Sequence, residues 1–227
     1  TAATIVKAAL IAMLFAVPLG VGAAIYSSEF AHPRVREFIK PVIETLAAIP
    51  SVVLGFFALM VLATLLQNTF GLLFRLNAIN AGIALGLAVI PVVFTVAEDA
   101  MTSVPQSLRD AAAALGANPW QVSLTTVLPA AIPGISAGVV LGFGRAVGET
   151  MIVLMATGNT AIMDLSIFNG MRPLSSNIAV EIPEAPHGGT LYRTLFLSAV
   201  ILFVMTFVVN TVAEVIRQRL RKKYGRF

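Results

Sequence analysis

Long apolar stretches separated by short polar segments dominate this sequence. A helix needs about 20 mostly apolar residues to cross about 30 Å of hydrocarbon. These stretches are continuous, whereas the strands of a membrane barrel alternate over about 10 residues. The five predicted spans are Ile5–Tyr26, Pro41–Leu66, Ile79–Ala97, Ala130–Thr157 and Leu191–Val215. The predicted fold class is therefore all-α, a polytopic transmembrane helix bundle, with 1–227 forming a single transmembrane domain.

Composition supports a membrane protein and excludes several kinds of site. Hydrophobic residues make up 58% of the chain and charged residues 11%, against about 25% charged in soluble domains, which argues against a soluble enzyme, a disordered chain or a nucleic-acid-binding domain. The chain has no Cys, and His32 and His187 lack metal-ligand spacing. No phosphate-binding GxxxxGK[ST] loop, Ser/His/Asp cluster or HExxH helix occurs. No metal, cofactor or catalytic residue is predicted, and any ATP must be bound by another chain.

The basic residues predict the orientation in the membrane. Three of them lie between the first two spans (Arg34, Arg36 and Lys40), and six lie in the tail 217–227. Positive residues concentrate in cytoplasmic loops, so both segments and the C-terminus are expected inside. Alternation then places 102–129 inside, and the N-terminus and 158–190 outside. Glu44 is expected to cap a helix end or to pair with a basic neighbour such as Lys40, four residues before it.

Two features of the outer side leave alternatives open. An outer N-terminus without an initiator Met or a signal peptide indicates missing upstream sequence with at least one further span; the alternative is a chain of five spans. The 158–190 loop, rich in Pro and Gly, suits docking of a binding protein, a re-entrant gate or a simple linker.

The inner segment 102–129 predicts two short helices. Pro105 between two serines is typical of a helix start, and Ala-rich residues follow it. Gly116 with Asn118-Pro119 is typical of a helix stop and a turn, after which 120–127 forms a second helix. Trp120 at its start is either an anchor at a partner interface or a membrane-interface residue.

This segment resembles the EAA loop of ABC importer permeases. The pattern is matched by Asp110-Ala111-Ala112, Gly116 and Leu128-Pro129 at the family's spacing, with Asp110 in place of the usual Glu and Thr126 in place of the usual Ile. The resemblance implies a coupling helix that docks into a cleft on the ATPase subunit. A small Ala face permits deep docking in a groove, and Gly116 permits a tight exit.

The fourth span combines glycines with two charges. Glycines spaced four residues apart let helix backbones approach closely in lipid, which predicts packing at the centre of a bundle. They are Gly134, Gly138, Gly142, Gly144 and Gly148. Arg145 and Glu149 lie on one face of this helix. A charged side chain in the middle of the bilayer is costly. The two residues form either a structural ion pair or part of a substrate path, in which the planar guanidinium of Arg145 binds anion oxygens.

The residues Gly144-Arg145-Ala146-Val147-Gly148-Glu149-Thr150-Met151, followed by Gly158-Asn159, resemble the GRAxGETM…GN segment of phosphate-specific ABC importer permeases, the PstC type more than the PstA type. The resemblance extends upstream to the Glu44–Gly55 segment. It implies a type I importer permease core of six spans and a substrate path through Arg145, Glu149 and Thr150.

The implied partners are a dimer of ATPase subunits, a second homologous permease subunit, an exoplasmic phosphate-binding protein and membrane lipid. The implied location is a bacterial inner membrane. Two alternatives remain: a permease for another oxyanion such as sulfate or molybdate, or a channel or secondary carrier that needs no ATPase.

Overall fold

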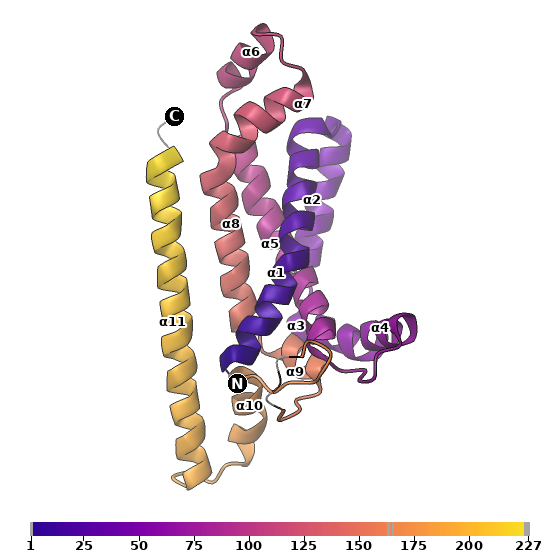
Figure 1. Ribbon diagram of the computed structural model, residues 1–227, viewed down its shortest axis with the longest axis vertical. Coiled ribbons are helices and arrows are strands. Elements are labelled where there is room, and N and C mark those ends of the chain that lie inside the picture. Colours follow the sequence, from indigo (N-terminus) through magenta and orange to yellow (C-terminus); the bar gives the residue numbers. More distant parts are fainter. Residues whose placement is uncertain (1, 163, 165, 225–227) are drawn as a thin grey trace. The chain divides into compact units, whose positions relative to one another are not determined.

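The structure, a computed structural model, describes residues 2–162, 164 and 166–224, and this part of the chain is helical with no strand (Figure 1). The elements in chain order are α1 (Ala2–Ile25), the π-helical η1 (Tyr26–Phe30), α2 (Pro33–Ala47), α3 (Ser51–Phe57), the π-helical η2 (Ala58–Leu62), α4 (Ala63–Phe70), α5 (Ala78–Thr102), α6 (Gln106–Ala114), α7 (Pro119–Val122), the π-helical η3 (Ser123–Val127), α8 (Leu128–Gly148), α9 (Met151–Thr157), α10 (Leu174–Glu181), the 3-10 segment η4 (Ile182–Glu184) and α11 (Thr190–Tyr224).

Among the residues that the structure describes, five helical segments are long and apolar enough to cross a membrane, as the sequence predicts. They are Thr4–Phe30, Ser51–Phe70, Ala78–Thr102, Pro119–Gly148 and Thr190–Val212. The all-α class is confirmed. The limits of the second and fourth spans differ from the prediction, and each difference has a local cause.

The second span begins at Ser51 rather than Pro41, because a proline separates two helices. α2 ends at Ala47, and Pro50 at the N-cap of α3 has extended backbone angles of φ −57° and ψ 139°. A residue that precedes proline is disfavoured in the helical region, so Ile49 breaks the helix. The segment expected as a basic loop is instead α2, which starts with Pro33 at its first turn.

The fourth span runs over Pro119–Gly148 rather than Ala130–Thr157. Its start differs because η3 joins α7 to α8: the N–H of Leu128 bonds the carbonyl of Ser123, five residues earlier. Pro129 has no N–H to donate, and the wider π turn lets the helix pass it without a break. Its end differs because α8 stops at Gly148 and α9 starts anew at Met151.

Contacts group the described residues into two compact units. Unit 1 comprises 1–15, 49–89 and 143–210, and unit 2 comprises 16–48, 90–142 and 211–227. The long helices α1, α5, α8 and α11 each contribute one part to each unit. The predicted tail 217–227 falls in unit 2, where α11 runs to Tyr224 and residues 225–227 lie outside the described part.

Unit 1 is held by close backbone contact and one buried amide. A Cβ on Gly86 of α5 would lie 3.3 Å from the carbonyl oxygen of Ala12 in α1, so these helices approach as closely as small residues permit. The fully buried Asn80 donates from Nδ2 to the carbonyl oxygens of Ala58 (3.3 Å) and Ala156 (2.9 Å). These bonds satisfy backbone groups of η2 and α9 that sit in an apolar interior.

Unit 2 has a compact apolar core built from α1, α5 and the 102–131 segment. Its buried members are Ala24, Phe94, Ala97, Met101, Val104, Val122, Val127 and Ala131. Leu108 and Ala112 of α6 and Ala117 pack against this core. The short helices of the inner segment are therefore anchored to this core, which fixes their orientation within unit 2.

The large apolar side chains of α11 are mostly exposed. They include Phe196, Leu197, Phe203, Val204 and Phe207. In a membrane span, such residues face lipid or other membrane proteins at little cost, because lipid tails are as apolar as these side chains.

Candidate functional site

Arg145 lies in the last turn of α8, in unit 1. Its side chain is exposed and makes no ion pair or hydrogen bond with any described residue. The position is electrostatically favourable, since a cation near a helix C-terminus meets the negative end of the helix dipole. The guanidinium therefore keeps all its donors available.

Glu149 does not pair with Arg145, although the spacing allows it. Its Oε1 accepts hydrogen bonds from the backbone N–H groups of Thr150 and Met151, both at 3.2 Å. A carboxylate at a helix start satisfies donors that have no partner within the helix. Glu149 thus bridges the break between α8 and α9, and the structural ion pair weighed for these two charges is not formed. Thr150, half-buried, occupies the N-cap of α9.

The glycines of α8 fall into a tightly packed group and a looser one. In unit 2, a Cβ on Gly134 would lie 2.3 Å from Cβ of Ala100, and one on Gly138 would lie 3.1 Å from Cβ of Val96. In unit 1, a Cβ on Gly144 would lie 2.9 Å from Oδ1 of Asn210, and one on Gly148 would meet no described atom within 4 Å. Gly142 is buried. Their assignment as packing residues remains a prediction.

The inner segment presents a small, polar-edged tip. Asp110 is exposed and accepts a 3.0 Å hydrogen bond from Gln106 Nε2. Ala111 is exposed, whereas Ala112 packs on the core of unit 2. Gly116 has φ +87°, which an L side chain adopts only with strain, and Leu115 beside it is 91% exposed. The predicted turn residue and the exposed Ala face lie together at this tip.

The second half of the segment is capped as the sequence suggests. Asn118 and Gln121 form a reciprocal capping box, with both bonds at 2.9 Å. Leu128 is half-buried and Pro129 exposed, and both lie within the continuous helix from α7 to α8. Trp120 is 57% exposed, and its ring centroid lies 5.5 Å from that of Phe30. Trp120 therefore contacts η1 as well as the surroundings.

The charged contacts that the sequence did not predict include three clusters. Glu98 at the end of α5, 1% exposed, pairs with Arg36 and Lys40 of α2 in unit 2. Lys40 also lies 3.2 Å from Oδ1 of Asp99, so the predicted pairing of Lys40 with Glu44 is wrong. The acidic pair Glu98-Asp99 directly after an apolar span, opposite a basic segment, is the signal that could have revealed this cluster.

The second cluster joins the inner segment to α1. Arg109 of α6 donates from Nη1 to Oε2 of Glu29 at 2.5 Å and from Nη2 to the carbonyl oxygen of Met101 at 2.9 Å. Glu29 lies in η1 and Met101 in the last turn of α5. Nothing in the local sequence around either residue indicates a partner about 80 positions away.

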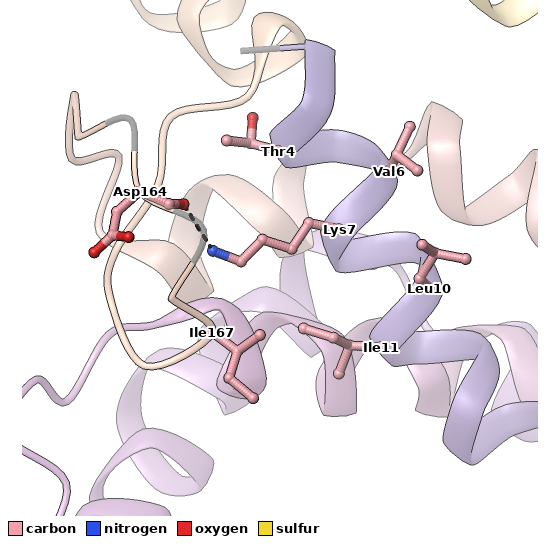
Figure 2. Close-up of a pocket in the computed structure, with 7 residues that line it drawn as sticks. All are labelled: Thr4, Val6, Lys7, Leu10, Ile11, Asp164 and Ile167. Atoms are coloured by element: carbon pink, nitrogen blue, oxygen red, sulfur yellow. Dashed lines mark hydrogen bonds between the residues drawn. The ribbon is translucent and has the colours of Figure 1, made fainter.

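The third cluster lies at the start of α1, in unit 1. Lys7 donates from Nζ to the carbonyl oxygens of Asp164 (3.2 Å) and Ser166, in the loop after α9. Figure 2 shows its side chain reaching from the helix toward Asp164. An open apolar cavity of about 370 Å³ surrounds it, lined by Thr4, Val6, Lys7, Leu10, Ile11, Asp164 and Ile167.

The described part of the 158–190 segment contains short helices and side-chain contacts of its own. It contains α10 and η4, and Arg172 donates to the carbonyl oxygen of Asn159 at 3.1 Å and pairs with Glu181 at 3.3 Å. Among the described residues, no group of three His, Cys, Asp or Glu side chains could hold a metal ion.

Comparison with known proteins identifies the family. Residues 16–225 match the family described as "binding-protein-dependent transport system inner membrane component". This chain belongs to that family. The permease is therefore a multi-pass membrane protein and a transport subunit.

Individual relatives agree with this assignment. The permease is 33% identical to the phosphate transport system permease protein PstC of Pasteurella multocida, over 95% of this chain and 73% of the relative. It is 35% identical to the probable ABC transporter permease protein YqgH of Bacillus subtilis, over 88% of this chain and 64% of the relative. The predicted resemblance to the PstC type is confirmed.

The fold also matches a solved importer. An inward-facing structure of the MetNI methionine ABC transporter superposes with a TM-score of 0.72, at 17% identity, over 96% of this chain and 94% of that one. At this identity the likeness concerns the fold alone, and it confirms the predicted type I importer permease core.

Proposed function

We propose that this permease moves inorganic phosphate through the membrane as one subunit of an ATP-driven importer. The observation that carries the proposal is Arg145: an exposed guanidinium at the end of an apolar span, with no ion-pair or hydrogen-bond partner among the described residues. Such a group binds phosphate oxygens in a bidentate way and stays charged at any physiological pH. The PstC relative, which is named as a phosphate transport permease, supports this choice of anion.

Glu149 has a different role in this proposal. Because its carboxylate is occupied by the backbone N–H groups of Thr150 and Met151, it holds the α8–α9 break in place rather than neutralising Arg145. Arg145 then sits next to a fixed turn, and Thr150 offers a hydroxyl in the same turn. The path residues are Arg145, Glu149 and Thr150, with Arg145 as the anion-binding group.

The remaining parts of the proposal concern partners and orientation. The tip around Gly116 docks into the ATPase subunit through Asp110, Ala111, Ala112 and the exposed Leu115, with Trp120, Leu128 and Pro129 supporting it. A second permease subunit completes the path, and an outer phosphate-binding protein delivers the anion to the 158–190 side. The C-terminus lies in the cytoplasm of a bacterial cell with the inner segment, and 1–227 works as one permease domain. Membership of a binding-protein-dependent family favours this over a channel or secondary carrier.

Replacing Arg145 tests the proposal. In the assembled transporter, reconstituted in vesicles, Arg145→Gln is expected to lower labelled-phosphate uptake by about ten- to hundredfold, the effect of losing a charge-assisted hydrogen bond. Arg193→Gln is the matched control, because Arg193 is another exposed arginine of unit 1. Normal uptake by Arg145→Gln would refute the role of Arg145.

Competition decides the anion. Unlabelled phosphate is expected to suppress the uptake of labelled phosphate, and sulfate and molybdate at the same concentration are not. If sulfate or molybdate competes better, the permease serves that oxyanion instead.

A further inference from the structure

The π-helical segment η1, which continues α1 beyond Ile25, is held by both short helices of the inner segment. Two neighbouring residues of η1 each make one contact. Glu29 accepts a hydrogen bond from Arg109 of α6, and the ring of Phe30 packs against that of Trp120 of α7. All of these residues belong to unit 2. π-helical turns inside longer helices are frequent at functional sites, and this one lies where α1 meets the inner segment.

The polar contact is buried and directional. The side chains of Glu29 and Arg109 are 6% and 17% exposed. Arg109 extends one arm of its guanidinium to Glu29 and the other to the Met101 carbonyl, so one rigid fork joins α6 to both η1 and the end of α5. A displacement of α6 must therefore move these two elements or break bonds from a largely buried charge, which is costly.

Glu29 depends on this contact. Its second oxygen, Oε1, is buried and receives no hydrogen bond from any described residue. Arg109 is thus the group that compensates the carboxylate among the described residues. Without Arg109 the carboxylate would be a buried, uncompensated charge.

The apolar contact is parallel to the polar one. The Phe30 and Trp120 ring centroids lie 5.5 Å apart with a 35° tilt, within the range of favourable aromatic pairs. Behind them, Leu108, Ala112 and Ala117 pack on the core that includes Ala24. Asp110 and Leu115 of the same segment remain exposed. One side of the inner segment is tied to η1 and the other is free for a partner.

We propose that Glu29 and Phe30 are the residues through which the inner segment moves α1, so that η1, α6 and α7 shift as one body when the ATPase subunits close. Glu29 and Arg109 are positioning residues, and neither touches the anion. The inference rests on the proposed docking of the tip at Gly116 and names the element inside the permease that receives its motion.

A chemical cross-link tests the one-body motion directly. Residues 1–227 contain no Cys, so Phe30→Cys with Trp120→Cys introduces two thiols into this part of the protein. A short bifunctional thiol reagent is expected to join them in the full-length chain within the assembled transporter, with phosphate uptake retained. If the double variant has lost uptake before the reaction, cross-linking is expected to restore it. Absence of the cross-link, loss of uptake on cross-linking, or failure to restore uptake would overturn the proposal. The two single variants, treated with the same reagent, are the controls.

A double-mutant cycle tests the polar contact. In transporters that retain the ATPase subunit on purification, Glu29→Gln and Arg109→Gln are each expected to lower the phosphate transported per ATP hydrolysed by about tenfold. Together they should lower it no further, because both remove one interaction. Arg109→Lys, which keeps the charge and loses the fork, should fall between them and the wild type. Arg34→Gln, an exposed arginine of the same unit, is the control.

The cycle gives outcomes distinct from those that test the proposed function. If the wild-type transporter takes up no phosphate, the proposed function fails. The double-mutant cycle of Glu29 and Arg109 can then still be measured through the ATP hydrolysis that the outer binding protein stimulates. If the wild type takes up phosphate but both single variants match Arg34→Gln, or their effects multiply in the double variant, the role of η1 fails alone. Should Arg109→Gln not assemble, Arg109→Lys and the cross-link decide.

Discussion

The Nε atom of Arg36 in α2 lies 2.9 Å from Oε1 of Glu98 in α5, and 62 residues separate them in the sequence. Nη2 of Arg36 donates to the same oxygen, and Lys40 lies 3.3 Å from the other carboxylate oxygen. The Glu98 carboxylate is buried, whereas both cations are more than a third exposed. Removing a cation therefore leaves a buried carboxylate, whereas removing the carboxylate leaves two cations that water can reach.

Replacing the arginine should destabilise the permease more than replacing the glutamate. Arg36→Gln leaves a buried carboxylate with only Lys40, at a cost of about 3 kcal/mol, or roughly 6–12 °C in apparent Tm. Glu98→Gln leaves two cations that can turn to water, at about 1 kcal/mol, or roughly 2–4 °C. Size-exclusion chromatography of the heated, detergent-solubilised transporter measures both values. Glu37→Gln, an exposed change in α2, is the control, and the reverse ranking would contradict the burial argument.

The same cluster predicts the behaviour of Lys40 with pH. Hydrogen bonding to Asp99, followed by the bond and charge of Glu98, raises the pKa of the Lys40 ammonium above its ordinary value of 10.5. A raised pKa stabilises the folded state below the unfolded pKa, and this contribution is lost as pH rises through the folded pKa. The Tm difference between wild type and Lys40→Gln should therefore stay constant from about pH 6 to pH 9 and shrink only above about pH 10.5.

Asp99→Asn isolates the largest cause of that shift. It should lower the pKa of Lys40 toward 10.5, which nuclear magnetic resonance of isotopically methylated lysines can follow, with Lys40→Arg assigning the signal among the four lysines of the chain. An unchanged titration in Asp99→Asn would show that Glu98 alone sets the value.

Gly116 separates backbone strain from coupling. Its φ of +87° and that of Gly71, +63°, both disfavour a side chain, while a Cβ at either would meet no described atom within 4 Å. Alanine should therefore cost about 1–2 kcal/mol at each position. Only Gly116→Ala should lower the phosphate transported per ATP hydrolysed, because Gly71 ends α4, away from the inner segment in sequence. Equal transport ratios for the two variants would count against docking at the Gly116 tip.

Gly134 tests close packing in unit 2. A Cβ there would lie 2.3 Å from Cβ of Ala100, so Gly134→Ala should lower stability by about 1–3 kcal/mol through overpacking. Adding Ala100→Gly should recover most of the loss, since it removes the atom that clashes. Gly22→Ala, where a Cβ meets no described atom within 4 Å, should have little effect. If the double variant is no more stable than Gly134→Ala, packing against Ala100 is not the cause. Thermal unfolding of the assembled transporter compares the three variants with the wild type.

Local patterns in the sequence were enough for the spans and for the inner segment. Length and hydropathy predicted five membrane helices, and the stop at Gly116 before Asn118-Pro119 predicted the turn that the structure has at φ +87°. Each of these features depends on residues that are contiguous in the sequence. The same locality explains the error at Lys40, because a partner four residues along the same helix, Glu44, is visible in the sequence and Glu98, 58 positions away, is not.

The long-range charge contacts could not be predicted in this way. Arg109 and Glu29 are 80 positions apart, and Lys7 binds backbone carbonyls 157 and 159 positions away. No periodicity links such pairs, because they depend on how the helices pack. The absence of an ion pair between Arg145 and Glu149 is similar: spacing permits the pair, but the helix break at Thr150 gives Glu149 closer donors.

The contact of Lys7 with the loop depends on the position of the loop's main chain and not on the identity of its side chains. Since both acceptors in the loop are main-chain oxygens, a side-chain replacement at Ser166 leaves the ammonium with the same two acceptors. The residue at position 166 can therefore change while its main chain stays bonded to α1. On the helix side the opposite holds, because one side chain makes both bonds, and a change at Lys7 would remove both at once, while the backbone bonds of Ile167 and Asn169 to the start of α5 would remain.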